Sequence, residues 1–302
     1  MVEPIKGRPG TPQRSIRRAF QQAAAGYDEV AVLPREVGDR LLERLDLIRI
    51  APRVVCDLGA GTGVATRELK TRYKSALVVA VDSAPAMLKL ARKRAPWLRR
   101  WRSVCADAEQ LPFADGSCDL VFSNLVLEWV TDLDRCVGEL RRVLSPGGCL
   151  LFSTLGPDTL RELRQAWAQV DQHCHVNDFL DMHDIGDALM RAGLADPVMD
   201  VERFTLTYRA LADLMCELNA QGSSVARGRA PGLTGSGRLA AATRAYETSR
   251  REGRLPATFE VVYGHAWGVG PPDPRLAQPA GRQYAAIGVE RLRNNLRGRR
   301  SS

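Results

Sequence analysis

The stretch from Val54 to Gly63 constrains the fold of this chain more than any other. In it an apolar run ends in Asp57, glycines follow at alternate positions, and a helix-compatible run, Val64–Leu69, comes next. These features are typical of a buried parallel strand, a tight turn and a helix N-terminus. Because glycine has no Cβ, such a turn can bend sharply and approach a ligand closely.

The glycine spacing is G-x-G-x-G, which differs from two familiar phosphate-binding turns. A dinucleotide fingerprint would need glycine where Val64 stands, and a P-loop would need a following Lys-Ser or Lys-Thr pair. The three glycines alone are a weak signal. The acidic residues around them, which come at regular distances, make it stronger.

Acidic residues end the next two predicted strands. Asp82 follows Leu77–Val81, Asp107 follows Val104–Ala106, and a fourth strand is predicted over Cys118–Asn124. An acid about 20 residues beyond the glycine turn can accept both hydroxyls of a ribose. A carboxylate on the third strand can reach the exocyclic amine of an adenine. Each acid alone could instead cap a helix, but their repetition at successive strand ends favours a ligand site.

Strands and helices alternate as far as about residue 155. Helices are predicted over 84–95 and 132–144, a turn at 145–148 and a fifth strand over 149–154. This alternation predicts an α/β fold with a parallel, doubly wound sheet.

The segments Asp57–Gly63, Asp82 and Asp107–Phe113 resemble the class I S-adenosylmethionine methyltransferases. The resemblance implies a Rossmann-like sheet with helices on both faces and S-adenosyl-L-methionine as cofactor. The glycine turn would lie under the methionine moiety, Asp82 on the ribose, and Asp107 beside the adenine. The cofactor-binding residues that it implies are Asp57, Gly59, Ala60, Gly61, Gly63, Asp82, Asp107, Ala108 and Asn124.

The segments on either side of this cofactor-binding core, 51–155, are predicted to be lids and tails. Residues 1–14 are rich in Pro, Gly and Arg and predict a disordered basic arm. Lid helices are predicted within 15–50, the first capped by Ser15 and the second over about 34–47. Such helices could cover the ligand end of the sheet and exclude water.

A second set of elements, 156–267, is predicted to complete the sheet and carry a helical insertion for the substrate. The predicted elements are helices over 160–170, 181–193, 210–220 and 236–251 and strands over 199–208 and 258–263. We expect no metal at His173, Cys174, His175 and His183, because adjacent H-C-H is not a usual tetrahedral spacing and no C-x-x-C pair exists. Residues 268–302 form a basic tail that we expect to be disordered.

Motifs in this second part are similar to those of the malonyl-[acyl-carrier protein] O-methyltransferases of biotin synthesis. The similar segments are Gly156–Leu160, His175–Asn177, Asp181–Asp187, Leu255–Trp267, Ala19–Tyr27 and Arg35–Val37. The likeness covers about residues 15–267. One difference is Pro34, where relatives commonly have glutamine, which argues against a polar lid role at that position.

The resemblance implies methyl transfer from S-adenosylmethionine to the free carboxylate of a malonyl thioester, an early step toward the pimeloyl part of biotin. Because carboxyl groups ionise at roughly pH 4, no general base is needed, and no convincing Ser-His-Asp or Cys-His set is present. Candidate partners for the carboxylate are Tyr27 and Arg35 in the lid, with Arg161 or Arg164 as alternatives. The arginines could equally be ordinary surface residues.

The net charge of +8 invites a nucleic-acid interpretation, but its distribution argues against one. Residues 1–18 carry +4 and residues 271–302 carry +5, which leaves −1 for the body. Basic tails are usually solvated. One basic face, drawn from Lys89 to Arg102, is either a solvated helix face or a docking surface for an acidic carrier protein.

Several further expectations follow from the sequence. It has no apolar run of about 18 residues and no signal segment, so we expect a cytoplasmic protein without a membrane span. We also expect a monomer with reduced cysteines. Asn124 is not followed by the Pro-Pro-Tyr of nucleobase methyltransferases, and Trp129 is predicted to pack under the sheet. The alternatives are a methyltransferase for another small molecule, such as a quinone, or a non-catalytic partner protein with this fold.

Overall fold

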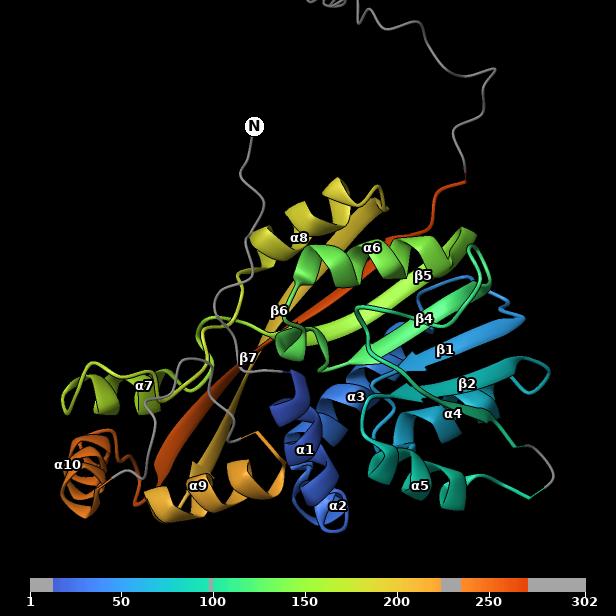
Figure 1. The fold of residues 1–302 in the computed structure, drawn as a ribbon. Coiled ribbons are helices and arrows are strands. Elements are labelled where there is room, and N and C mark those ends of the chain that lie inside the picture. Colours follow the sequence, from blue (N-terminus) through green and yellow to red (C-terminus); the bar gives the residue numbers. More distant parts are fainter. Residues whose placement is uncertain (1–12, 98–99, 224–234, 271–302) are drawn as a thin grey trace, which may run out of the picture. The chain divides into compact units, whose positions relative to one another are not determined.

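The fold is built around a mixed sheet of seven strands in the order β3-β2-β1-β4-β5-β7-β6 (Figure 1). The computed structural model describes residues 13–97, 100–223 and 235–270. The strands are β1 (Val54–Leu58), β2 (Leu77–Asp82), β3 (Arg102–Cys105), β4 (Cys118–Asn124), β5 (Leu144–Leu155), β6 (Ala195–Tyr208) and β7 (Leu255–Trp267). The first five pair in parallel, and β7 lies antiparallel between β5 and β6.

Helices cover both faces of this sheet, which confirms the predicted α/β class. They are α1 (Gln13–Ala23), α2 (Tyr27–Val30), α3 (Val32–Arg44), α4 (Val64–Arg72), α5 (Pro85–Arg94), α6 (Leu133–Val143), α7 (Arg161–Ala168), α8 (Met182–Arg191), α9 (Leu211–Ala220) and α10 (Ser236–Glu247), with the 3₁₀ helix η1 (Leu127–Trp129). In Figure 1, α6 and α8 lie above the sheet and α3 and α4 below it.

The apolar runs in the sequence arise because the strands are buried on both sides. Val55 belongs to the core cluster shared with α3 and α4, whereas its neighbour Cys56 belongs to the cluster shared with α6 and α8. Successive side chains of a strand point to opposite faces, so a strand covered on both faces reads as continuously apolar. The described residues up to Gly270 belong to one compact unit, and the segment boundaries within it stay predictions.

The structure corrects three sequence predictions at the ends of elements. Helix α1 already includes residues 13 and 14, so Ser15 lies in its first turn and is not its cap. The predicted turn at 145–148 is drawn into β5, because Gly147 N–H donates to the Gly268 carbonyl and Gly268 N–H to the Gly148 carbonyl, each at 2.8 Å. β7 is longer than predicted because it pairs with strands on both of its edges. The arm 1–12 and the tail beyond residue 270 lie outside the described residues.

The ligand end of the sheet depends on the glycine turn between β1 and α4. Gly59, Gly61 and Gly63 have φ values of 70°, 52° and 84°, a region that costs other residues roughly 1–2 kcal/mol. A Cβ on Gly59 would lie 2.1 Å from the Val126 side chain. The turn is therefore tight for steric reasons as well as conformational ones.

We predict that Gly59→Ala destabilises the protein by at least about 2 kcal/mol, because left-handed strain adds to overpacking against Val126. Denaturant unfolding measures this change. The matched control is Gly138→Ala on the exposed side of α6, where a Cβ meets nothing within 4 Å and alanine should stabilise the helix by up to about 1 kcal/mol. Equal effects of the two substitutions would contradict this account.

Candidate active site

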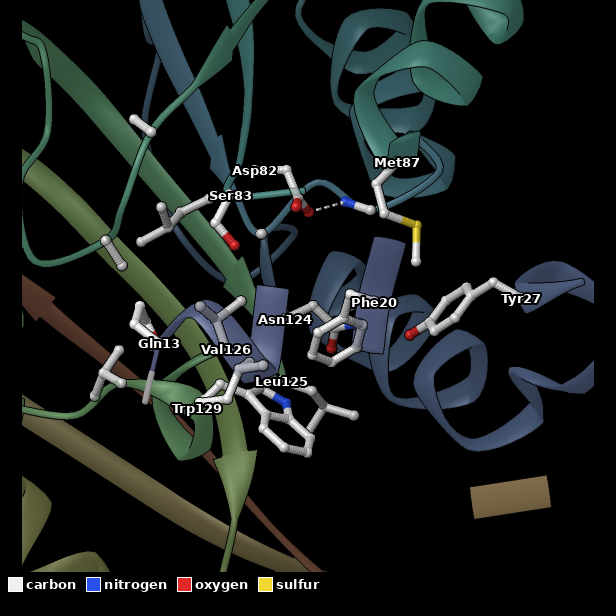
Figure 2. Close-up of a pocket in the computed structure, with 17 residues that line it drawn as sticks. Gln13, Phe20, Tyr27, Asp82, Ser83, Met87, Asn124, Leu125, Val126 and Trp129 are labelled. Carbon is white, nitrogen blue, oxygen red and sulfur yellow. Dashed lines mark hydrogen bonds between the residues drawn. The ribbon is translucent and has the colours of Figure 1, made fainter. Parts of the chain in front are cut away.

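Three cavities meet at the carboxyl ends of β1, β2 and β4, and Tyr27 lines all of them. The β2 cavity is bordered by Asp82, Ala106 and Ala108, and Figure 2 shows it. The α3 cavity is bordered by Asp57, Thr62 and Arg35. The two share Tyr27, Gly59, Gly61 and Asn124. The third, the chamber, encloses about 610 Å³ among α1, α7, α9 and α10.

Asp82 is held rigidly at the tip of β2. Its Oδ2 accepts from Gly61 N–H at 2.9 Å and its Oδ1 from Ala84 N–H at 2.7 Å. Burial raises the pKa of its carboxyl, and the two backbone donors oppose that shift. Each carboxylate oxygen has more than one lone pair, so Asp82 can still accept two donors from the β2 cavity, as a diol would require.

Asp57 lies beneath the glycine turn, with only 2% of its surface exposed. Its Oδ2 accepts a hydrogen bond from the Thr66 hydroxyl of α4, which ties that helix to β1. Burial raises the pKa of Asp57 to about 7, and nearby Asp82 adds to the shift. Its carboxyl therefore titrates near neutral pH at the border of the α3 cavity.

Asp107 is partnered by the N-terminal lid. Its Oδ1 accepts from Glu109 N–H at 2.9 Å and from the Gln13 side-chain amide of α1 at 3.3 Å. The neighbouring Ala108 borders the β2 cavity and so does Gln13, whereas Asp107 is not among the residues that line it. The sequence placed Asp107 at this end of the sheet, but it gave no sign of Gln13.

Asn124 joins the tip of β4 to the lid helix α3. Its side-chain amide donates to the Pro34 carbonyl at 2.9 Å, and its Oδ1 accepts from the Ser153 hydroxyl at 2.8 Å. A Cβ on Gly38 would lie 3.0 Å from the Asn124 amide nitrogen, so α3 needs glycine there to approach closely. The lid contact at Pro34 thus uses its backbone, and no polar side chain is needed.

Tyr27 presents a neutral hydroxyl to the junction of the three cavities. Its hydroxyl makes no hydrogen bond with the described part of the chain, and Figure 2 shows it turned toward Phe20. Burial raises the Tyr27 pKa far above its usual value, and the carboxylates of Asp82, Glu128 and Asp28 add to this. The hydroxyl can therefore donate a hydrogen bond but does not ionise.

Arg35 borders the α3 cavity and is not part of the chamber wall. It donates to the Asp28 carbonyl at 3.0 Å. The Asp28 carboxylate in turn accepts from the Thr62 hydroxyl at 2.6 Å and pairs with Arg94 at 2.5 Å. This clasp joins α2, the glycine turn and α5. Because Arg94 is paired with Asp28, its charge is not free on the basic face. Residue 99 of that face lies outside the described residues.

Phe20 and Trp129 separate the β2 cavity from the chamber and line both. Their rings meet edge to face at a centroid distance of 5.2 Å. The prediction that Trp129 packs under the sheet is therefore wrong, because α1 supplies its partner. Leu125 lies on the same boundary with φ of 53°, a strained conformation of the kind that is found at functional sites.

The two alternative arginines are engaged elsewhere. Arg161 pairs with Glu162 at 3.3 Å and Asp158 at 3.8 Å. Arg164 donates to three backbone carbonyls around the chamber wall, at distances of 2.9 to 3.3 Å. Among the described residues that line the chamber there is no lysine or arginine. A carboxylate in the chamber would thus meet neutral donors, His175 and the acidic Glu128.

His175 is an aromatic part of the chamber wall. Its Nε2 lies 2.8 Å from Asp171 Oδ1, and its ring stacks on Trp167 at 3.7 Å. His183 instead pairs with Asp181 on an exposed surface. Within the described ranges, no three His, Cys, Asp or Glu side chains are grouped to hold a metal ion.

Comparison with known proteins identifies the family. A family model described as a methyltransferase domain matches residues 56–152. The malonyl-[acyl-carrier protein] O-methyltransferase of Halorhodospira halophila is 56% identical over 261 residues, which are 85% of this chain and 88% of that protein. Its namesake in Methylovorus sp. is 50% identical over 273 residues, 88% of this chain and 91% of that protein. The chain belongs to this methyltransferase family.

Solved structures add information about the fold alone. The cyclase SpnF matches with a TM-score of 0.58 at 17% identity, over 87% of this chain and 100% of that one. Because a cyclase shares this architecture, the fold alone does not determine which reaction a protein catalyses. In the described part of this family member, no helix is long and apolar enough to cross a membrane.

The raised pKa of Asp57 predicts how stability changes with pH. In an unfolded chain aspartate ionises near pH 3.9, whereas in the folded protein the value is about 7. The contribution of this group to stability is therefore full below the unfolded pKa and is lost as the pH rises through 7. Between pH 6 and 8 the unfolding free energy should fall by about 1.4 kcal/mol through Asp57 alone.

Urea unfolding at pH 6, 7 and 8 tests this, with Asp57→Asn compared with the unaltered protein. The variant should lack this part of the pH dependence. Asp184→Asn, on an exposed position of α8, is the control and should follow the unaltered protein. Parallel pH curves for all three proteins would show that Asp57 does not titrate as described.

Proposed function

We propose that this protein uses S-adenosylmethionine to methylate the free carboxylate of a malonyl thioester carried by an acyl-carrier protein. The relatives support this substrate by their names, at 50% and 56% identity. The observation that carries the proposal is the chamber of about 610 Å³, which joins the cofactor-type cavities at Tyr27. The methyl ester product would serve the pimeloyl part of biotin.

The residues present fit the proposed cofactor. The glycine turn forms a cradle that a Cβ on Gly59 would fill, and Asp82 keeps lone pairs for a ribose diol. In the α3 cavity, Arg35 suits a carboxylate and Asp57 an ammonium group, so the amino-acid end of the cofactor belongs there. When bound, S-adenosylmethionine supplies an electrophilic methyl group on a sulfonium.

The chamber residues suit a carboxylate that acts as the nucleophile. Carboxyl groups are ionised at neutral pH, so no side chain has to remove a proton. Tyr27 stays neutral and can orient one carboxylate oxygen by donating to it. A bidentate arginine would bind both oxygens strongly, and its absence from the described lining leaves the second oxygen available to react.

The shape of the chamber suits a thioester on a long arm better than a free small acid. Its walls are mainly apolar, with Trp129, Trp167, Phe179 and Phe259 among the lining residues. Burial of an arm against such walls gains roughly 25 cal/mol per Å² of apolar surface. A quinone-like ring could also enter, but the sequence relatives do not favour it.

The carrier protein needs a docking surface as well as a chamber. Lys89, Arg92 and Lys93 are exposed on α5, and an acidic carrier would be attracted to them. The basic tail, outside the described residues, is the other candidate. We also propose that the protein is located in the cytoplasm and is a monomer.

We predict that Tyr27→Phe lowers kcat/KM for malonyl-carrier protein by about 10- to 100-fold, since an orienting hydrogen bond to a charged group is worth roughly 1.5–3 kcal/mol. Radiolabelled methyl transfer measures this, with acetyl-carrier protein as the substrate control. Tyr263→Phe is the matched variant, because that buried hydroxyl has no hydrogen-bond partner among the described residues and Tyr263 lines none of the three cavities.

The control variant should keep full activity on the malonyl form, and no protein should label the acetyl form. Unchanged kinetics in Tyr27→Phe would remove the tyrosine from the mechanism. Labelling of acetyl-carrier protein would remove the carboxylate from it.

A further inference from the structure

The two ring nitrogens of His175 have different surroundings, and one of them is held by Asp171. His175 Nε2 lies 2.8 Å from Asp171 Oδ1, which also accepts from His173 N–H at 3.0 Å. The other oxygen of this carboxylate pairs with Arg238 of α10 at 3.4 Å. Desolvation would raise the pKa of Asp171, but the hydrogen bonds from His175 and His173 outweigh it and lower the pKa. Because an ionised carboxylate only accepts, Nε2 is the nitrogen that carries a proton.

The second ring nitrogen of His175, Nδ1, is open to a ligand. It makes no hydrogen bond with the described part of the chain, and it is not among the buried polar atoms that lack a partner. It is therefore accessible, on a residue that lines the chamber. The ring stacks on Trp167 with centroids 3.7 Å apart and an angle of 9° between the planes. A ring that is fixed in this way loses little conformational entropy when it binds a ligand.

His175 lies at the end of the chamber that is far from the cofactor-type cavities. Its stacking partner Trp167 belongs to α7, and Arg238, which pairs with Asp171, belongs to α10. In Figure 1 these two helices lie on the left, far from β1 and β2, whose carboxyl ends border the β2 cavity. Under the proposed function the methyl group is transferred near Tyr27, where the chamber meets the cofactor-type cavities. His175 would thus meet the part of the substrate behind the reacting carboxylate.

We propose that His175 binds an amide group of the arm that carries the malonyl thioester. The phosphopantetheine-type arm of a carrier protein contains amide groups, each with an N–H donor and a carbonyl acceptor. A neutral imidazole accepts at Nδ1 and a charged one donates there, so an amide can satisfy either form. A carboxylate offers acceptors only and would suit the charged form alone. The inference rests on the proposed function and adds to it a residue that recognises the arm.

An Asp-His pair in a substrate chamber can also serve as a general base. Two observations favour recognition of the arm over this role. The proposed nucleophile is a carboxylate, which is already ionised at neutral pH, and the pair lies between α7 and α10, away from Tyr27. His175 is therefore a specificity residue, whose loss should affect binding of the arm and not the chemical step.

The test compares two small substrates that share the malonyl group. Malonyl-pantetheine has the amides of the arm, whereas the S-hexyl malonyl thioester has none. His175→Phe keeps the stacking ring and removes both nitrogens. We expect it to raise KM for malonyl-pantetheine about three- to tenfold, the loss of one neutral hydrogen bond, with kcat unchanged. KM for the hexyl thioester should stay the same, and His183→Phe, on an exposed position of α8, should change neither value.

Each outcome has a distinct meaning. Equal increases in KM for both substrates would show that His175 only supports the chamber or meets the malonyl group. Unchanged values for both would show that it does not contact the arm. Either result would overturn the inference while leaving methyl transfer intact. If the unaltered protein labels neither thioester, nor malonyl-carrier protein, the proposed function on which the inference rests is wrong.

Discussion

The structure of the site depends on one hydrogen bond, from Gly61 N–H to the Asp82 carboxylate. It joins the turn after β1 to the tip of β2, where two parallel strands end side by side. The turn can make this contact only because its three glycines adopt positive φ. The contact in turn holds the carboxylate of Asp82 toward the β2 cavity. Ligands of open α/β sheets bind at such a point, where the strand order reverses about β1.

Charge around this point suits a cationic ligand. Asp82 borders the β2 cavity and Asp57 borders the α3 cavity. Burial raises the pKa of both carboxyl groups. A cationic sulfonium or ammonium group nearby would favour their ionised forms. The chamber on the other side of Phe20 and Trp129 has no described lysine or arginine in its lining. Glu128 is among the lining residues, so under the proposed function the counter-charge for a substrate carboxylate would be the sulfonium of the cofactor.

Local pattern in the sequence was enough to predict the sheet. The strands β1, β2 and β4, the turn and the acids Asp57, Asp82 and Asp107 all follow from short-range periodicity and glycine spacing, and the structure confirms where they lie. Their roles in binding stay predictions. The inclusion of Gly147 in β5 could not be predicted, because it depends on pairing with Gly268, which is distant in the sequence.

The lid contacts could not be read from sequence for the same reason. Gln13 meets Asp107 across 94 positions and Arg94 meets Asp28 across 66. Neither pair has a local signature, since each depends on how α1 and α2 pack on the sheet. Trp129 was misplaced because its partner, Phe20, comes from the same lid. Arg35 lies in the predicted lid, but only the packing of α3 shows that it borders the α3 cavity.

The most direct measurement is methyl transfer from labelled S-adenosylmethionine to malonyl-carrier protein and to its malonamyl counterpart, in which a neutral amide replaces the carboxylate. The account predicts label on the malonyl form alone, released as methanol by mild base, as a methyl ester requires. Equal labelling of both forms, or label that resists base, would contradict carboxyl methylation.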